Sequence, residues 1–205
     1  IQIAELVEVE PEKTATEILT EAIMEPSGQT LETLIEPGVN VAIAVDVYSS
    51  PQAVVQALSL LSKMLVELIV PKDRITILLG SGEFEKENRI LRDAINDTPE
   101  LKEIQIIDHT RNTTNLVELG ETIKGTPVEV NRRYHEAKLK IAIGETRIDY
   151  LTGYAGAHSS IIPGLASPKT INEYKRTYFD TEVTPGTIEL NSIKEDVLEA
   201  VAKTG

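Results

Sequence analysis

The sequence Val39-Asn-Val-Ala-Ile-Ala-Val45-Asp46-Val-Tyr48-Ser49-Ser50-Pro51 contains the pattern that decides the fold. Residues 39–45 are apolar except for Asn40 and are rich in Val and Ile, which is typical of a strand buried on both faces. The strand ends in polar residues, and Ser50 is expected to cap a helix that has Pro51 in its first turn. That helix is apolar nearly all round, as expected when a helix packs between a sheet and another layer.

The same pattern returns along the chain. Residues 74–79, 104–107 and 139–143 are further apolar strands, and the first two of these are separated by a helix with an apolar face. Alternating strands and helices with continuously apolar strands predict an α/β fold, in which a parallel sheet has helices on both faces. The flanking segments predict a strand at 1–9, helices near 14–24, 30–35, 131–137 and 170–176, and a strand pair at 116–119 and 127–130 around Gly125.

Asn191-Ser192 is expected to cap a final helix whose Ile193, Val197, Ala200 and Val201 form one apolar face. Such a face must dock, either on this domain or on another one. We therefore divide the chain into an α/β domain at residues 1–190 and a C-terminal helix at 191–205, which we interpret as the hinge to a second domain.

Composition narrows the classes of partner. The net charge of −13 argues against nucleic acid and anionic membrane as general partners, because both need clustered Lys and Arg. The longest apolar segment, residues 53–70, is interrupted by polar residues and predicts a buried helix instead of a membrane span. The absence of cysteine and of a signal pattern at the start fits a cytoplasmic protein without disulfides or thiolate metal sites.

In a parallel sheet, ligands bind beyond the carboxyl ends of the strands. Four strand ends are therefore candidates, at residues 46–50, 80–83, 108–112 and 144–149, and all four are polar. Gly80-Ser81-Gly82 lies between a strand and a helix, where backbone N–H groups favour an anion. A tight turn that needs glycine explains the same residues equally well, and Glu83 opposes a highly charged phosphate.

The stretch from Ile141 to Gly164 begins in the last strand and then places many polar side chains around Gly144, Gly153 and Gly156. Its His158-Ser159-Ser160 would need a base and an orienting acid in space to supply a serine nucleophile, and adjacency in sequence does not provide them. Asp46, His109, Asp149 and His158 offer oxygen and nitrogen ligands for a metal, but none of their spacings is diagnostic. Arg111 and Arg147 either hold a carboxylate ligand or form surface ion pairs.

Three blocks of this region resemble the N-terminal domain of the nickel-dependent lactate racemase family. They are Leu119–Arg132, the stretch Ile143-Gly144 through Gly153-Tyr154-Ala-Gly156, and Ile161-Ile-Pro163-Gly164-Leu-Ala with Thr170-Ile171. Leu190-Asn191-Ser192-Ile193 is similar to the family segment that leads to the hinge. The resemblance implies a Rossmann-like domain that faces a second α/β domain across a cleft. It also implies a lysine-tethered nickel pincer cofactor that exchanges hydride with a 2-hydroxy acid, with two histidines as acid and base and a third on nickel.

The residues at the matching positions differ from that machinery. The family's Asp-Asp-x-Thr-Arg is Asp46-Val47-Tyr48-Ser49-Ser50 here, and its Gly-Thr-His-Arg is Gly82-Glu83-Phe84-Glu85. The family's Pro-His is Ile148-Asp149, and its Asn-His is Tyr174-Lys175. Its Gly-Gly-x-Lys is Gly156-Ala157-His158-Ser159, so Ser159 replaces the lysine that anchors the cofactor. We therefore predict no bound cofactor, since the hydride chemistry lacks its tether, nickel ligand and proton-transfer groups.

The leading hypothesis is a lactate-racemase-like domain with a diverged nickel site that binds a small hydroxy acid or carboxylate at the strand ends. One alternative is a non-catalytic interaction or structural domain, with a second domain or another copy of the chain as its partner. Another is a racemase or epimerase of a 2-hydroxy acid that uses substitute residues, so whether the chain is an enzyme stays open. The predicted ligand-binding residues are Asp46, Tyr48, Ser49, Ser50, Gly80, Ser81, Gly82, Arg147, Asp149, His158 and Ser159.

Overall fold

The computed structural model describes residues 12–80, 85–110, 114–176 and 183–205. The chain forms two compact units, of which the first ends at Ile35 and the second comprises Glu36–Gly205. The first unit contains helix α1 (Ala15–Met24) and helix α2 (Leu31–Leu34), neither of which has a buried residue. A capping box opens α1, because Thr14 Oγ1 accepts from the N–H of Glu17 while the Glu17 carboxylate accepts from the N–H of Thr14. The predicted strand at residues 1–9 lies outside the described residues.

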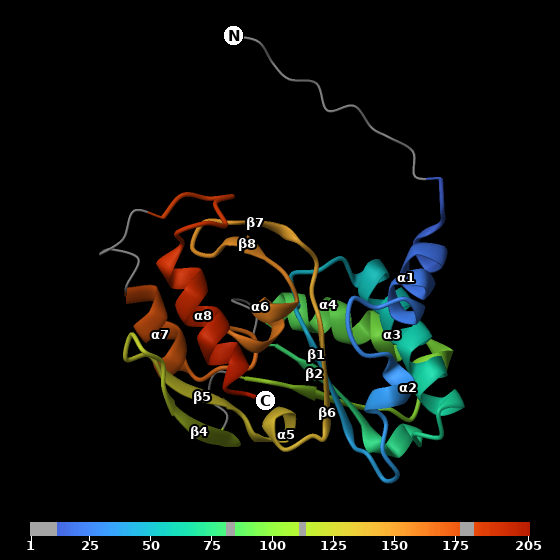
Figure 1. Ribbon diagram of the computed structural model, residues 1–205. Helices are drawn as coiled ribbons and strands as arrows, with labels where there is room; N and C mark the ends of the chain where they lie inside the picture. Colours follow the sequence, from blue (N-terminus) through green and yellow to red (C-terminus); the bar gives the residue numbers. More distant parts are fainter. Residues whose placement is uncertain (1–11, 81–84, 111–113, 177–182) are drawn as a thin grey trace. The chain divides into compact units, whose positions relative to one another are not determined.

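The second unit is built on a four-stranded parallel sheet (Figure 1). Its strands are β1 (Val41–Val45), β2 (Ile75–Leu79), β3 (Gln105–Asp108) and β6 (Leu139–Ile143), in the order β3-β2-β1-β6. All five residues of β1 are buried, as its apolar sequence predicts for a central strand. The α/β class predicted from the strand pattern is confirmed.

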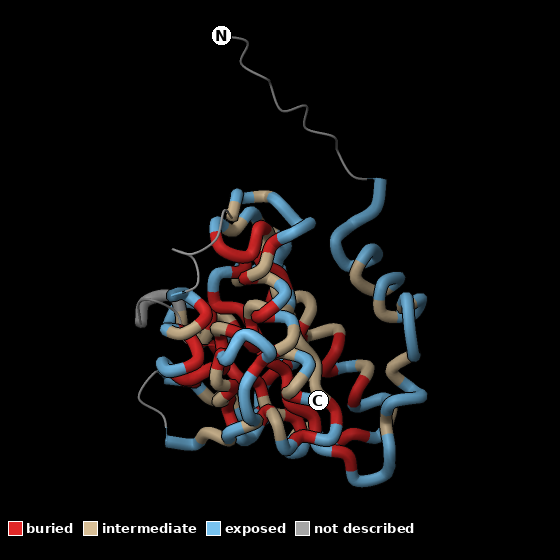
Figure 2. Tube along the Cα trace, turned by 60° about the vertical axis from the view of Figure 1, so that its left-hand side comes forward, coloured by how far each residue is buried: buried red, intermediate tan, exposed pale blue. Residues whose placement is uncertain are grey.

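Helices cover both faces of this sheet. Helices α3 (Pro51–Glu67) and α4 (Glu85–Asn96) connect β1 to β2 and β2 to β3 and lie together on one face, whereas α6 (Ala157–Ile161) contacts β1 and β6 from the other (Figure 1). Side chains alternate along a strand, so Ala42 and Ala44 point to the α6 side and belong to the buried cluster there. Their small size lets α6 approach the sheet closely. Figure 2 shows the buried residues concentrated in the sheet and in the helices against it.

A further layer extends the α6 side of the sheet. It consists of the antiparallel pair β4 (Leu116–Glu121) and β5 (Pro127–Asn131), the short helix α5 (Arg132–His135), and helices α7 (Pro168–Arg176) and α8 (Ser192–Ala202). The pair was predicted around Gly125, which has a positive φ of 83° and lies in the turn. Within the described residues, the other helical segments are the 3-10 turns Lys72–Arg74 and Pro99–Leu101.

Helix α8 docks on this unit. Ile193, Val197 and Ala200 are buried in the cluster on the α6 side, and Asn191 caps the helix by accepting from the N–H groups of Ile193 and Lys194, as predicted. The buried Asp196 accepts from the hydroxyls of Thr122 and Thr126 at 2.5 and 2.7 Å, so the turn between β4 and β5 is fixed to the helix. The proposed boundary at residue 190 and a second domain beyond it stay predictions.

Two local predictions differ from the structure. The side chain of Ser50 makes no capping hydrogen bond at α3, although Pro51 does open the helix. The polar stretch after β6 is not a plain loop but contains a hairpin of β7 (Arg147–Asp149) and β8 (Gly153–Ala155). Strands of three residues leave too little alternation for a sequence pattern to reveal them. No helix in the described ranges has the length and apolar character needed to cross a membrane.

Candidate functional site

The order of the strands creates a switch point between β1 and β6. The chain runs from β1 outward to β2 and β3, and then returns to pair β6 with the opposite side of β1. The connections that leave the carboxyl ends of β1 and β6 therefore diverge, and ligands of open α/β sheets bind in the crevice between such connections. Asp46 and the residues around Arg147 stand at these two ends.

An ion pair joins the two strand ends. Nη1 of Arg147 donates to Oδ2 of Asp46 at 2.6 Å, and the other carboxylate oxygen of Asp46 accepts from the N–H of Tyr48 at 3.1 Å. The guanidinium lies over the ring of Tyr48, 5.6 Å from its centroid. Asp46 is only 4% exposed, so its charge depends on these partners. Arg147 therefore forms an ion pair, but with a buried carboxylate instead of a surface one.

Two hydrogen bonds strengthen the same junction. Ser49 Oγ, which is buried, accepts from the N–H of Glu145 at 2.9 Å, and Glu145 Oε2 accepts from the N–H of Ser50 at 2.9 Å. Ser49 and Ser50 therefore hold the loop after β1 to the loop after β6. Ser49 does this through its side chain and Ser50 through its backbone N–H, and neither residue lines the cavity described below.

Glycines let the backbones at this edge of the sheet touch each other. A Cβ on Gly144 would lie 2.5 Å from the carbonyl oxygen of Gly156, and a Cβ on Gly80 would lie 2.9 Å from Cα of Gly164. Both distances are shorter than a side chain tolerates, and in both cases the obstacle is backbone. The glycines of the predicted stretch thus bring the end of β6 to the start of α6, and the end of β2 to the turn after α6.

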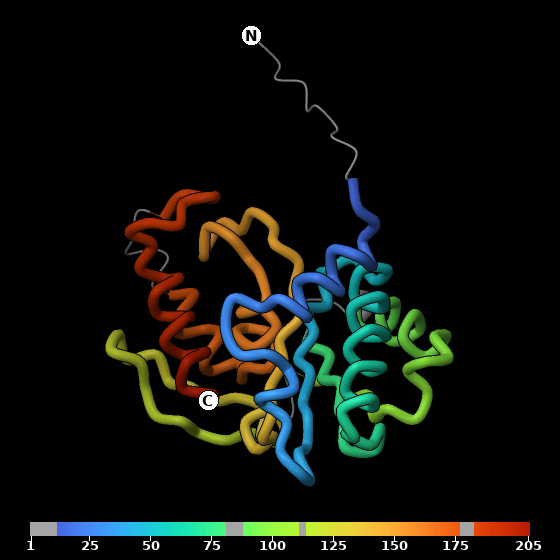
Figure 3. Tube along the Cα trace, turned by 45° about the vertical axis from the view of Figure 1, so that its right-hand side comes forward, coloured from blue at the N-terminus to red at the C-terminus, as the bar shows by residue number. Residues whose placement is uncertain are grey.

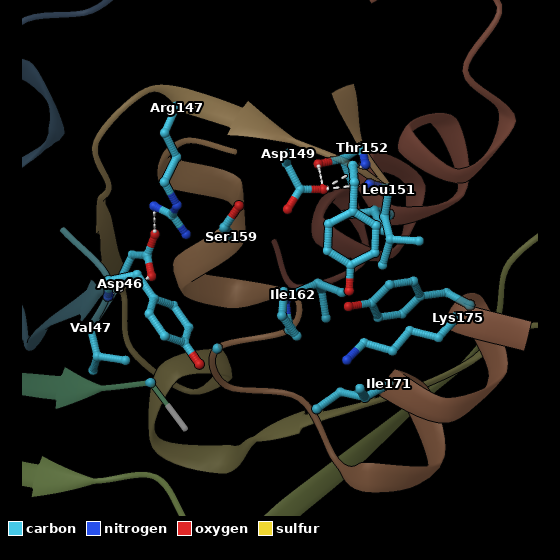
Figure 4. A pocket seen from close by; sticks show the side chains of 17 residues that line it. Asp46, Val47, Arg147, Asp149, Leu151, Thr152, Ser159, Ile162, Ile171 and Lys175 are labelled. Atoms are coloured by element: carbon cyan, nitrogen blue, oxygen red, sulfur yellow. Dashed lines mark hydrogen bonds and ion pairs between the residues drawn. The ribbon is translucent and has the colours of Figure 1, made fainter. Parts of the chain in front are cut away.

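A cavity of about 270 Å³ opens at this edge (Figure 4). Its wall combines the ends of β1 and β2, the β7–β8 hairpin, α6 with the turn that follows it, α7 and α8. The lining residues are Asp46, Val47, Tyr48, Gly80, Arg147, Asp149, Tyr150, Leu151, Thr152, Ser159, Ile162, Pro163, Gly164, Ile171, Tyr174, Lys175 and Val197.

Asp149 shapes the hairpin turn from inside the cavity. Its Oδ1 accepts from the N–H of Leu151 at 2.9 Å, from the N–H of Thr152 at 2.7 Å and from the Thr152 hydroxyl at 3.0 Å. These three bonds all use one oxygen. The second oxygen, Oδ2, points toward the middle of the cavity (Figure 4).

Lys175 enters the cavity from α7 on the opposite side. Ile171, Tyr174 and Lys175 follow the helical spacing of three and four residues, so they share one face of the helix, and all three line the cavity. Figure 4 shows the Lys175 side chain extending over Ile171 toward the interior. Within the described residues Lys175 has no hydrogen bond or ion pair. Sequence reasoning placed Tyr174-Lys175 on the family pattern but not in the site, although the helical spacing beside Ile171 was a usable signal.

His158 and Ser159 lie on α6 and have different surroundings. Ser159 lines the cavity, and its Oγ accepts from the N–H of Gly156 at 3.3 Å. His158 is half-buried outside the lining, and its Nε2 is a buried atom with no hydrogen-bond partner in the described part of the chain. Burial lowers the pKa of His158, the positive charge of Lys194 lowers it further, and the carboxylates of Asp149 and Asp46 act in the opposite direction.

His109 belongs to the core instead of the site. It is 1% exposed, its Nε2 lies 3.1 Å from the carbonyl oxygen of Ala166, and its Nδ1 lies 3.1 Å from Nδ2 of Asn131. This geometry fits a neutral ring that accepts from Asn131 and donates to Ala166, and burial lowers the pKa accordingly. With both ring nitrogens engaged, His109 does not join Asp46, Asp149 and His158 as a metal ligand. Across the described ranges, no three His, Asp or Glu side chains converge as a metal site would require.

The structure thus brings together six of the predicted ligand-binding residues around one cavity: Asp46, Tyr48, Gly80, Arg147, Asp149 and Ser159. Ser49, Ser50 and His158 stand outside its lining. Ser81 and Gly82, and with them Arg111, fall outside the described residues. The hairpin turn and α7 add the residues that sequence reasoning missed, chiefly Thr152 and Lys175.

Comparison with known proteins identifies the group of proteins that share these features. The family model of the lactate racemase N-terminal domain matches residues 1–185. The lactate racemase of Thermoanaerobacterium thermosaccharolyticum is 30% identical over 108 residues, which is 48% of this chain and 24% of the relative. The lactate racemase of Lactiplantibacillus plantarum is 27% identical over 141 residues, covering 64% of this chain and 32% of that protein.

Two solved structures have the same fold. The lactate racemase apoprotein from T. thermosaccharolyticum superposes with a TM-score of 0.75 at 23% identity, over 93% of this chain and 46% of that one. A Thermotoga maritima protein superposes with a TM-score of 0.64 at 17% identity, over 92% and 46%. This chain therefore spans about a quarter to a third of the length of the two relatives and about half of the two solved chains.

Proposed function

The chain belongs to the lactate racemase N-terminal domain family, and from this premise we propose that the cavity beyond β1 and β6 binds a small carboxylate or hydroxy acid. The two relatives are both described as lactate racemases, which makes a small organic acid the natural class of ligand. The position of the cavity at the switch point of the sheet supports the same choice.

Lys175 is the observation that carries the proposal. Four charged side chains line the cavity, and three of them have partners: Asp46 pairs with Arg147, and Asp149 accepts three hydrogen bonds from its own turn. Lys175 has no partner in the described part of the chain. Thr152 and Ser159 line the same cavity as this cation. A ligand that carries both a carboxylate and a hydroxyl group therefore suits the cavity.

The nickel pincer cofactor does not fit the residues present, and we include its absence in the proposal. A tether of the family type needs an amine on α6, whereas Ser159 presents a hydroxyl that accepts from the N–H of Gly156. Histidines of the family pattern are also replaced, because Asp149 and Lys175 occupy two of the matching positions. His109 is engaged in the core by both of its ring nitrogens. We therefore derive no hydride step for this chain.

Calorimetric titration tests the proposal. The intact chain is titrated with lactate, longer 2-hydroxy acids and the corresponding carboxylates, beside the variant Lys175→Gln. At least one acid of the panel should bind, and the variant should weaken it about tenfold, which corresponds to roughly 1.4 kcal/mol for one lost charged contact. Lys63→Gln is the matched control, since Lys63 is also an exposed helical lysine without an ion pair among the described residues. Absence of binding across the panel would refute the proposal.

The cofactor part has its own test. The chain is produced together with the enzymes that assemble the nickel pincer, and its intact mass and nickel content are measured. We expect the unmodified mass and no retained nickel. A covalent mass increment would contradict the proposal, and Ser159→Ala would then show whether α6 carries the attachment.

A second candidate function, a docking surface for a second domain or another copy, is favoured by exposed apolar side chains around the hairpin. Ile148 and Tyr150 on the hairpin and Ile188 and Leu190 before α8 are all more than half exposed, with Leu190 at 95%. The two segments pack together, because the N–H of Gly186 donates to the carbonyl of Gly153 at 3.0 Å (Figure 3). Sedimentation of the chain against an Ile148→Ser, Leu190→Ser double variant tests this. Self-association of the unaltered chain, and its loss in the double variant, would favour the interaction role.

A further inference from the structure

The charges of the cavity divide into a matched pair and an unmatched pair. Asp46 and Arg147 neutralise each other at 2.6 Å at one end of the cavity. Asp149 and Lys175 remain, with opposite signs, and neither forms an ion pair within the described residues. The cavity therefore offers one negative and one positive group to a ligand and has no net formal charge of its own.

The two unmatched groups come from different elements and face a common space. Asp149 is on the hairpin and Lys175 is on α7, and Figure 4 shows both side chains extending toward the interior from opposite sides. Oδ1 of Asp149 is taken up by the turn, but a carboxylate accepts at both oxygens, so Oδ2 retains its acceptor capacity. A ligand that bridges these groups needs a cationic donor at one end and a carboxylate at the other.

Apolar residues line the cavity together with Tyr150 and Tyr174. Leu151, Ile162, Ile171 and Val197 contribute to the lining, and Ile162 is 1% exposed at the floor of the cavity. The cavity has a volume of about 270 Å³. That space suits a small molecule with a short aliphatic side chain.

We propose that the ligand is a zwitterionic α-amino acid with a short aliphatic side chain, whose ammonium binds Asp149 Oδ2 and whose carboxylate binds Lys175. This inference rests on the proposed function, since it names which small carboxylate the cavity takes. A 2-hydroxy acid has the same shape, but its hydroxyl leaves the charge of Asp149 without a counter-charge. An ammonium group supplies that charge together with charge-assisted hydrogen bonds, which are roughly twice as strong as neutral ones.

Leucine and 2-hydroxy-4-methylpentanoate form the matched pair of probes, because they differ only in the amino and hydroxyl group. Each enantiomer is titrated calorimetrically into the intact chain at neutral pH. Leucine should bind on the order of tenfold more tightly than its hydroxy analogue, in keeping with one additional charged contact.

Variants assign the two contacts. Asp149→Asn keeps an acceptor oxygen for the turn and removes the charge, so it should raise the Kd of leucine to that of the hydroxy analogue without changing the latter. Lys175→Gln should raise both Kd values by the same factor, on the order of tenfold. Lys63→Gln on α3 should change neither. Thermal unfolding of each variant reports whether the hairpin turn and the fold are retained.

The outcomes separate the inference from its premise. If the hydroxy analogue binds the unaltered chain as tightly as leucine or more tightly, the zwitterion inference is wrong and carboxylate binding stands. If Asp149→Asn raises the Kd of both probes by the same factor, Asp149 does not discriminate the amino group from the hydroxyl, and the inference is likewise wrong. If neither probe nor any acid of the wider panel binds, the proposed function itself fails, and the inference fails with it.

Discussion

The guanidinium of Arg147 lies 2.6 Å from the carboxylate of Asp46, across 101 positions of sequence. This contact joins the first residue of the β7–β8 hairpin to the end of the central strand β1. The carboxylate is buried and the guanidinium side chain is 34% exposed, so the pair is only partly screened by solvent. The ion pair therefore holds the cavity-lining hairpin to the sheet. Without Arg147, the charge of Asp46 would remain buried and unpaired.

Replacing Arg147 with Met should lower the free energy of unfolding by about 1–3 kcal/mol, because it leaves the charge of Asp46 buried without its cation. The double variant Asp46→Asn, Arg147→Met should recover part of the loss, since no unpaired charge remains. Urea unfolding of all three proteins measures both effects. Arg176→Met is the control, because the one ion pair of Arg176 within the described residues joins it to Glu173 at the surface. If the single and the double variant lose the same free energy of unfolding, the unpaired charge of Asp46 is not what destabilises the single variant.

Asp196 should be the most sensitive position on α8. Asp196→Ala removes the acceptor of the Thr122 and Thr126 hydroxyls and leaves both donors buried, at an expected cost of about 2–4 kcal/mol. Adding Thr126→Val should offset some of this cost, because its orphaned hydroxyl is then gone, whereas Thr122 is kept because its Oγ1 accepts from the N–H of Thr126. Glu195→Ala, which changes an exposed residue of the same helix, should cost less than about 0.5 kcal/mol. Chemical denaturation compares the four proteins.

Gly144→Ala should destabilise the chain and disturb the cavity together. The added methyl would meet the carbonyl of Gly156, which is backbone and cannot rotate away, so the start of α6 must shift. Overpacking of this kind typically costs about 1–3 kcal/mol. Gly28→Ala is the control, since nothing lies within 4 Å of its Cβ position. A normal melting temperature for Gly144→Ala would show that the two backbones are not in close contact.

Acid should weaken the fold before most carboxylates titrate. Burial lowers the pKa of both His109 and His158 below the ordinary value of 6.5. Just below pH 6.5, the two histidines are therefore protonated in the unfolded chain to a greater extent than in the folded chain. Their contribution is fully present above pH 6.5 and is lost as the pH falls through the folded-state values. The free energy of unfolding in urea should therefore fall between pH 7 and pH 5, and His109→Gln should flatten that slope. Stability that is constant or rises over this interval would contradict the prediction.

The sequence predicted the sheet well because its central strands are buried on both faces. The unbroken apolar run of β1 and the polar residues after it identify both the strand and the edge where a ligand binds. The β7–β8 hairpin was missed because its order comes from Asp149 Oδ1 and from Gly153, which has a positive φ of 75°, and neither leaves a periodic pattern. Lys175 was missed because its relevance depends on which face of α7 meets the cavity.

The roles of polar residues were the hardest to foresee. Ser49 and Ser50 stand next to Asp46 in sequence, yet they hold Glu145, while Asp149 reaches the cavity from the far side of the crevice. Side chains at a strand end point in different directions, and a sequence does not say which of them a neighbouring loop will engage. His158 shows the same difficulty, since it directly precedes Ser159 on α6, yet the serine lines the cavity and the half-buried histidine does not.

The contact between Gly144 and Gly156 makes the hairpin an exchangeable cassette. The chain leaves β6 at one glycine and comes back beside it at the other, so the residues between them can change while the two glycines and the Arg147–Asp46 pair keep the entry and exit points fixed. Selectivity could then diversify within residues 145–155 without any change in the strands. Grafting the corresponding segment of another family member between these two glycines is thus a direct route to a redesigned recognition surface.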